Sequence, residues 1–187
     1  MKRVYLVHGW GGSSEDNWFP WLKKELEERG AEVYSLDMPD TSHPKIEEWV
    51  KELEYRIDEA DRQTYFIGHS IGCQTILRYM EKLHRDRKIG GCLFVAPWFN
   101  LINLNPEEME IAHPWINTRA DFGRIIEHCT KFVSLFSEDD PDVPLSDSEI
   151  FRRKLGSEII VEKGKGHFTE REEPEILREA LKMLRLK

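Results

Sequence analysis

The stretch from Thr64 to Met80, TYFIGHSIGCQTILRYM, constrains the fold of this chain more than any other. It begins with an apolar, aromatic run typical of a buried strand, turns through Gly68-His69-Ser70-Ile71-Gly72, and continues with apolar residues at helical spacing. A Gly-x-Ser-x-Gly turn between a strand and a helix is the nucleophile-elbow pattern. Such a tight turn strains the backbone of Ser70, and side chains at the two glycine positions would collide with neighbouring backbone.

This turn predicts a reactive serine. The Ser70 hydroxyl would project above the sheet, and the amide of Ile71 would point from the helix N-terminus to the place where an oxyanion forms. The alternative is a glycine-flanked turn whose serine only caps the helix. The buried strand before the turn and the helix after it favour the catalytic interpretation.

Short apolar segments alternate with amphipathic ones along all 187 residues. Strands are expected near residues 4–7, 32–36, 65–67, 89–96, 131–136 and 158–162, and helices near 15–29, 44–60, 71–80, 122–129, 146–155 and 174–186. This alternation predicts one α/β domain over residues 1–187, with a doubly wound, mainly parallel six-stranded sheet and helices on both faces. Residues 98–121 break the rhythm with turn signals and are expected to form a short irregular insertion.

Composition restricts the classes of function. The formal net charge is −8, and no basic stripe with interleaved aromatic residues is present, so we expect no nucleic-acid partner. The first apolar run is too short for a signal peptide, and no segment approaches the length of a membrane span. Three widely spaced cysteines favour reduced thiols, and we expect a cytoplasmic monomer or small homo-oligomer.

The predicted base and acid lie in loops after the later strands. In open α/β sheets, ligands bind beyond the carboxyl ends of the strands, where these loops meet. A serine nucleophile needs a base, and the base needs a carboxylate that fixes its tautomer. His167 follows the last strand in a glycine-bordered loop and is the predicted base; the alternative is an exposed loop histidine. The second oxyanion donor is predicted to be the backbone amide of Trp10, in the glycine-rich loop after the first strand.

The acid has to be chosen among the carboxylates of one loop. Asp140 is favoured because Pro141 fixes the backbone directly after it. Asp139 and Asp142 remain alternatives.

No metal and no cofactor are expected. The alternative is a metal site formed by His8, His69 and His167, which is disfavoured because the chain has no His-x-x-x-His or Cys-x-x-Cys spacing. His69 is instead expected to point away from the Ser70 hydroxyl, and His8 to shape the loop that carries the Trp10 amide.

Five segments together resemble the α/β-hydrolase superfamily: VHGWGG near the start, GHSIGC, VAP, SEDDPDVP and GKGHF. More narrowly, the chain is similar to small single-domain serine hydrolases of the retinoblastoma-binding protein 9 and YdeN-like type. The resemblance covers essentially the whole chain and implies Ser70 as nucleophile, Asp140 as acid and His167 as base. It also implies an esterase or related acyl hydrolase without a large cap. No cysteine here lies in an L-x-C-x-E motif, so binding to the retinoblastoma protein is not expected.

Aromatic residues at the catalytic end suggest the substrate. Trp98, Trp115 and Phe168 lie in or beside these loops and are predicted to line an apolar pocket, although both tryptophans could simply pack residues 98–121 onto the sheet. The short insertion predicts an open, shallow site suited to small soluble esters.

Two other functions stay open. A peptidase or amidase with the same triad would need a carboxylate for the substrate amine, such as Asp37, Asp40 or Glu138. A catalytically idle binding protein on the same scaffold is the third possibility.

Overall fold

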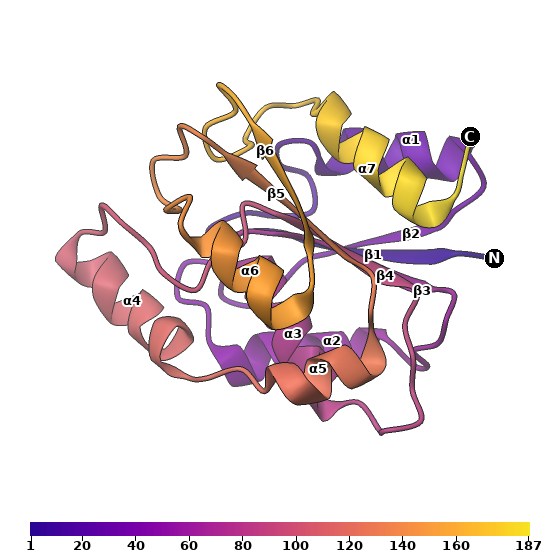
Figure 1. The fold of residues 1–187 in the computed structure, drawn as a ribbon, viewed down its shortest axis with the longest axis horizontal. Coiled ribbons are helices and arrows are strands. Elements are labelled where there is room, and N and C mark those ends of the chain that lie inside the picture. Colours follow the sequence, from indigo (N-terminus) through magenta and orange to yellow (C-terminus); the bar gives the residue numbers. More distant parts are fainter.

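The computed structural model describes residues 1–187 as a six-stranded sheet with seven helices (Figure 1). The strands are β1 (Arg3–Val7), β2 (Glu32–Leu36), β3 (Thr64–His69), β4 (Gly91–Val95), β5 (Phe132–Ser137) and β6 (Glu158–Glu162). The helices are α1 (Phe19–Glu28), α2 (Ile46–Arg56), α3 (Ile71–Lys82), α4 (Pro106–Asn117), α5 (Phe122–His128), α6 (Asp147–Leu155) and α7 (Pro174–Leu184).

The sheet is parallel throughout, with the strand order β2-β1-β3-β4-β5-β6. Helices α1 and α7 cover one face, and α2, α3, α5 and α6 cover the other (Figure 1). The predicted fold class is therefore confirmed. Such a sheet is buried on both faces, which explains why β3 and β4 are apolar along most of their length rather than alternating.

The strand order places a crevice beside β1. The chain passes from β1 to β2 at one edge and then returns to place β3 on the other side of β1. At such a reversal the loops leaving the two neighbouring strands diverge, and a crevice opens at their carboxyl ends. The loop after β1 and the turn after β3, which carries Ser70, therefore lie side by side.

One continuous hydrophobic core joins the sheet to both helical layers. Trp18, which directly precedes α1, and Trp49 of α2 have no exposed surface. All three cysteines are free and buried. Cys73, on the first turn of α3, fills space there, and burial raises the pKa of its thiol well above the usual value. No helix of the chain combines the length and the apolar character needed to cross a bilayer.

The segment of residues 98–121 is more regular than predicted. The expectation of an irregular insertion is wrong for Pro106–Asn117, which form α4. Asn105 caps this helix, because its side chain accepts from the Glu108 amide at 3.0 Å while the Glu108 carboxylate accepts from the Asn105 amide at 2.9 Å. Pro106 stands at the first helical position, where a proline is compatible with the start of a helix.

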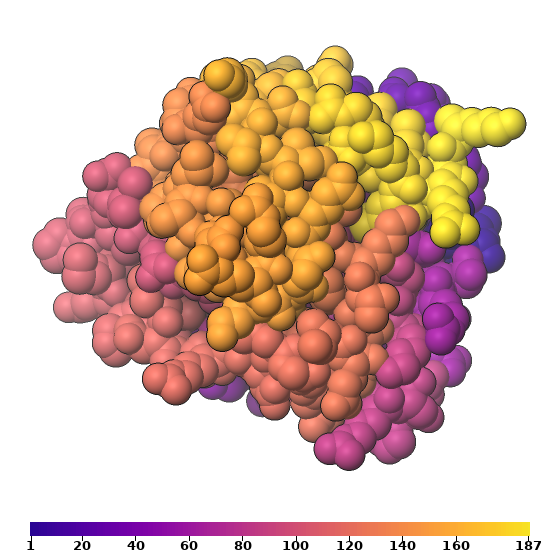
Figure 2. Space-filling model, viewed as in Figure 1, coloured from indigo at the N-terminus to yellow at the C-terminus, as the bar shows by residue number.

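Helix α4 stands apart from the sheet. Only Ala112 and Trp115 of its residues are buried. In the space-filling view the α4 region forms one side of the surface, and the C-terminal end of the chain lies at the opposite side (Figure 2).

Candidate active site

Ser70 stands in a strained turn between β3 and α3. Its backbone has φ 52° and ψ −122°, a conformation that residues with side chains rarely adopt. The Ser70 side chain makes no capping hydrogen bond to α3, so it does not act as the helix cap of the alternative interpretation. The amide of Ser70 donates to the carbonyl of Val95 at 2.9 Å, which ties the turn to the end of β4.

The two glycines of the turn are required by close backbone approach. A Cβ on Gly72 would lie 2.4 Å from the carbonyl oxygen of Val7, and a Cβ on Gly68 would lie 2.9 Å from the amide nitrogen of Cys73. Real Cβ atoms do not approach backbone atoms this closely. The glycines therefore allow α3 to pack directly on the end of β1, as the sequence pattern predicts.

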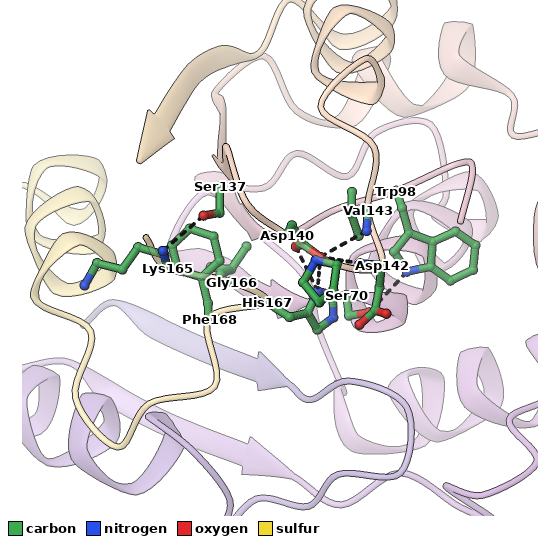
Figure 3. A network of polar contacts seen from close by, with 12 residues as sticks. Ser70, Trp98, Ser137, Asp140, Asp142, Val143, Lys165, Gly166, His167 and Phe168 are labelled. Carbon is green, nitrogen blue, oxygen red and sulfur yellow. Dashed lines mark hydrogen bonds and ion pairs between the residues drawn. The ribbon is translucent and has the colours of Figure 1, made fainter. Parts of the chain in front are cut away.

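The structure brings Asp140 and His167 together. His167 Nδ1 lies 2.9 Å from Asp140 Oδ2 and 3.1 Å from Oδ1 (Figure 3). Asp140 Oδ1 also accepts from the amides of Asp142 at 2.9 Å and Val143 at 3.0 Å, and the Asp140 side chain is only 2% exposed. An ionised carboxylate can only accept a hydrogen bond, so the Nδ1 of His167 must carry the proton. The Nε2 of neutral His167 is then an acceptor.

Hydrogen bonds from distant elements fix the loop that carries His167. His69 Nε2 donates to the His167 carbonyl at 2.8 Å, and Trp18 Nε1 donates to the Phe168 carbonyl at 3.0 Å. On the other side of the loop, Asp139 Oδ1 accepts from the amide of Gly166 at 3.2 Å. His69 therefore binds the loop that carries His167, a contact that could not be foreseen from the sequence.

His69 is held in its neutral form. Burial, together with repulsion from His167 when that ring is protonated, lowers the pKa of His69 from 6.5 to about 3. The neutral imidazole with its proton on Nε2 is the form that donates to the His167 carbonyl.

This buried histidine makes the fold sensitive to acid. Between about pH 6.5 and about pH 3 the unfolded chain binds a proton at His69 that the folded chain does not, so stability falls as pH falls. The contribution is up to about 1.4 kcal/mol per pH unit. The free energy of unfolding, measured with urea at pH 7, 5 and 4, should therefore fall less with decreasing pH in His69→Gln than in the wild type. The Gln amide can still donate to the same carbonyl. Identical pH slopes for the variant and the wild type would contradict this assignment.

The loop after β1 presents the Trp10 amide. His8 shapes this loop: its Nδ1 lies 2.8 Å from the Gly9 carbonyl, and its Nε2 accepts from the Met38 amide at 3.0 Å. Burial lowers the pKa of His8, consistent with a neutral ring. The Trp10 amide donates to no protein acceptor, and Ile71, the first residue of α3, has no acceptor within its own helix. Both amides are therefore available to a ligand.

A cavity of about 330 Å³ opens at this edge of the sheet. It is lined by Ser70, His167, Trp10 and Trp98, by Leu101, Leu104 and Glu108 of the segment around α4, and by other residues of the first loop.

The structure does not bring Trp115 and Phe168 to this cavity, although both were expected there. The Trp115 indole is buried between α4 and α2, where its Nε1 donates to the Pro44 carbonyl at 2.9 Å and its ring packs against Trp49. Phe168 follows His167, but its side chain is fully buried in the core. Trp98 is thus the one of the three predicted pocket residues that lines the cavity.

The other carboxylates considered have different surroundings. Asp139 accepts from Ser137 Oγ at 2.6 Å, and that hydrogen bond lowers its pKa. The side chain of Asp142 lines the cavity beside His167. Asp37, Asp40 and Glu138 lie outside the lining, and Asp37 accepts from the Ser14 amide at 2.7 Å.

The possible metal ligands His8, Asp140 and His167 already take part in hydrogen bonds within the protein. Both ring nitrogens of His8 are already hydrogen bonded, which leaves it no free ligand atom. Asp140, Asp142 and His167 offer ligand atoms within 4.8 Å of one another, but Asp140 and His167 satisfy each other and the Asp140 oxygens also accept two amides. This cluster is explained without a metal.

The parallel sheet and the Gly-x-Ser-x-Gly turn at its switch point define an α/β-hydrolase fold. A family model described as serine hydrolase matches residues 4–185, so the chain belongs to the serine hydrolase family.

Individual relatives agree with this assignment. The chain is 31% identical to YdeN of Bacillus subtilis over 91% of this chain and 88% of that protein. The crystal structure of the ydeN gene product superposes with a TM-score of 0.90, at 28% identity, over 99% of this chain and 100% of that one. Serine hydrolase RBBP9 of Rattus norvegicus is 24% identical over 97% and 95% of the two chains. Est1E of Butyrivibrio proteoclasticus shares the fold, with a TM-score of 0.75 at 18% identity over 97% and 87%.

Proposed function

We propose that this serine hydrolase cleaves small carboxylic esters through an acyl-enzyme on Ser70, with His167 as base and Asp140 as acid. The observation that carries the proposal is the Asp140–His167 pair: the Asp140 side chain is buried, and His167 lines the same cavity as the strained Ser70. A serine hydroxyl becomes a useful nucleophile only beside such an oriented base. The family assignment supports the same chemistry.

In the acylation step, the Ser70 Oγ attacks the ester carbonyl while His167 Nε2 takes the hydroxyl proton. The carbonyl oxygen becomes an oxyanion, and the amides of Trp10 and Ile71 are the donors proposed to receive it. When the tetrahedral intermediate collapses, His167 returns the proton to the leaving alcohol. Asp140 keeps the imidazole in the required tautomer and stabilises its transient positive charge.

In the deacylation step, water takes the place of the alcohol. His167 Nε2 accepts a proton from water, whose oxygen attacks the acyl carbon, and then protonates Ser70 Oγ as the carbon–Oγ bond breaks. The products are a carboxylic acid and the free serine. No cofactor or metal takes part in this proposed sequence.

The cavity favours a small ligand. Its volume of about 330 Å³ lies at the low end of the range for small-molecule sites. Trp98, Leu101 and Leu104 offer apolar contact to an acyl or alcohol group. With its formal net charge of −8, the chain is a poor match for nucleic acid, and a small ester remains the proposed partner.

A peptidase or amidase would use the same residues and remains the alternative. None of Asp37, Asp40 and Glu138, named from the sequence as candidates for binding a substrate amine, lines the cavity. Three other carboxylates, those of Asp16, Glu108 and Asp142, do line it and are available to a substrate amine. Ester and amide hydrolysis are therefore separated by the choice of substrate and not by the lining.

The substrate class is tested by comparing p-nitrophenyl acetate with alanine p-nitroanilide at equal concentration. We expect turnover of the ester and at least about a hundredfold lower kcat/KM for the anilide, a difference of about 2.7 kcal/mol in transition-state stabilisation. Faster cleavage of the anilide would support the peptidase alternative. Failure to cleave either substrate by folded protein would favour the idle binding protein.

A further inference from the structure

The indole of Trp98 contacts the proposed nucleophile directly. Trp98 Nε1 lies 3.2 Å from Ser70 Oγ, and the Trp98 side chain is 1% exposed. In the view of Figure 3, Ser70 lies between Trp98 and His167. Sequence reasoning places Trp98 in the pocket only as an apolar surface, so this polar contact calls for a separate explanation.

The direction of this hydrogen bond is fixed by chemistry. An indole N–H only donates, so Ser70 Oγ must accept from Trp98 with one of its lone pairs. The single hydroxyl proton of Ser70 is then free to point elsewhere. Because Asp140 assigns the proton of neutral His167 to Nδ1, the unprotonated Nε2 is the matching acceptor in the same cavity.

The backbone that carries Trp98 is held on both sides. Before it, Ala96 has φ 46°, a left-handed conformation that is unfavourable for a residue with a side chain and that directly precedes Pro97. After it, the amides of Phe99 and Asn100 donate to Asp147 Oδ2 at 2.6 and 2.8 Å. Asp147 is only 1% exposed, so a buried carboxylate fixes the chain just beyond the indole.

The strained backbone at Ala96 and the hydrogen bonds to buried Asp147 indicate that the surrounding structure holds the Trp98 indole in one position. Packing of an apolar ring alone would not require a donor directed at Ser70 Oγ. The arrangement is what a preorganised hydrogen-bond donor needs, because such a donor acts without reorganising during the reaction.

We propose that Trp98 is a further catalytic residue, whose indole N–H stabilises Ser70 Oγ as the leaving oxygen when the acyl-enzyme breaks down. This inference rests on the proposed acyl-enzyme mechanism. In deacylation the electron pair of the acyl carbon–Oγ bond moves to Oγ, which takes its proton from the His167 imidazolium. The product acid keeps the oxygen supplied by water. Negative charge thus develops on the atom that accepts from Trp98, and hydrogen bonds to a charged acceptor are stronger than neutral ones.

The acylation step gains less from the same donor. There the hydrogen bond makes the Ser70 hydroxyl more acidic but its oxygen less nucleophilic, and the two effects oppose each other. Loss of the N–H should therefore slow deacylation more than acylation, a difference that a purely structural contact would not produce.

Trp98→Phe removes the donor and keeps an aromatic ring. With p-nitrophenyl acetate, we expect steady-state turnover to fall about tenfold and the fraction of acetylated enzyme, measured by intact mass after acid quench, to rise. The rate of labelling by a fluorophosphonate, which reports attack by Ser70 without deacylation, should change less than about threefold.

Trp49→Phe is the matched control. The Trp49 indole is also fully buried and donates to a carbonyl, that of Pro39, at 2.7 Å, but it lies outside the cavity lining. Trp49→Phe should lower the thermal stability of the protein by about as much as Trp98→Phe does. The acetylated fraction of Trp49→Phe should equal that of the wild type.

The possible outcomes are distinct. Trp98→Phe with wild-type turnover, or with attack and deacylation slowed equally, would overturn the inference. If the wild type forms no acyl-enzyme on Ser70 at all, the proposed function fails, and the inference fails with it.

Discussion

Asp140→Asn is expected to lower ester turnover by about 10⁴-fold while leaving the fold intact. The carboxamide oxygen would stay on the amides of Asp142 and Val143, which can only donate. Its NH₂ group would then replace Oδ2 and donate to His167 Nδ1. The imidazole would be forced into the tautomer with its proton on Nε2, where it cannot act as a base. The measurement is kcat for p-nitrophenyl acetate, with circular dichroism to verify folding.

Variants of the same loop provide the control. Asp139→Asn and Asp142→Asn should each lower kcat for p-nitrophenyl acetate by less than about tenfold, because neither carboxylate forms a hydrogen bond with the His167 ring. Asp139 instead accepts from Ser137 and Gly166, and the Asp142 side chain only lines the cavity. A larger loss in either variant than in Asp140→Asn would reassign the acid.

Gly72→Ala is expected to destabilise the protein by about 3 kcal/mol and to abolish most of its ester turnover. The added methyl group would lie 2.4 Å from the Val7 carbonyl and 2.7 Å from the His8 carbonyl. Both are backbone atoms at the end of β1, so the contact cannot be relieved by turning a side chain. Helix α3 would have to move away from β1, which displaces Ser70 from the loop that presents the Trp10 amide. Urea unfolding measures the stability change.

Gly123→Ala separates this clash from a general effect of adding a methyl group. Gly123 lies in α5, where the nearest atom to a new Cβ would be Asp121 Oδ1 at 3.4 Å. Alanine is the better helix former, so this variant should be neutral or more stable by up to about 1 kcal/mol. Equal stability of Gly72→Ala and Gly123→Ala would contradict the close packing of α3 on β1.

The parts of the molecule that the sequence predicts well depend on local patterns. The alternation of strands and helices along the sequence is sufficient to predict the six-stranded parallel sheet. The two glycines around Ser70 predicted a turn whose reason, the approach of α3 to β1, is visible in the structure. Asp140 and His167 were placed near each other because both follow strands of a parallel sheet, and their loops must end at the same edge.

The errors depend on contacts between segments far apart in the chain. The position of Trp115 beside the catalytic loops suggests a pocket residue. Nothing in the local sequence shows that its indole instead reaches the carbonyl of Pro44, before α2. Phe168 adjoins His167, and only the tertiary structure reveals that the chain turns its ring into the core. The bonds from His69 and Trp18 to the His167 loop span 98 and 150 residues and leave no local signal.

Helix α4 was not predicted, although its start has a local signal in the sequence. Asn105-Pro106-Glu107-Glu108 is a recognisable helix start, with a cap, a proline at the first position and an acid at the third. Pro114 within the helix and the turn signals before it favour an irregular segment instead. The start signal was therefore present and could have been used.

The central claim, that Ser70 is an activated nucleophile, is tested most directly by treating the intact protein with a fluorophosphonate probe and mapping the adduct by mass spectrometry. The account predicts one adduct, on Ser70, and no labelling of a folded Ser70→Ala variant. No adduct on well-folded wild-type protein, or an adduct on another residue that persists in Ser70→Ala, would contradict it.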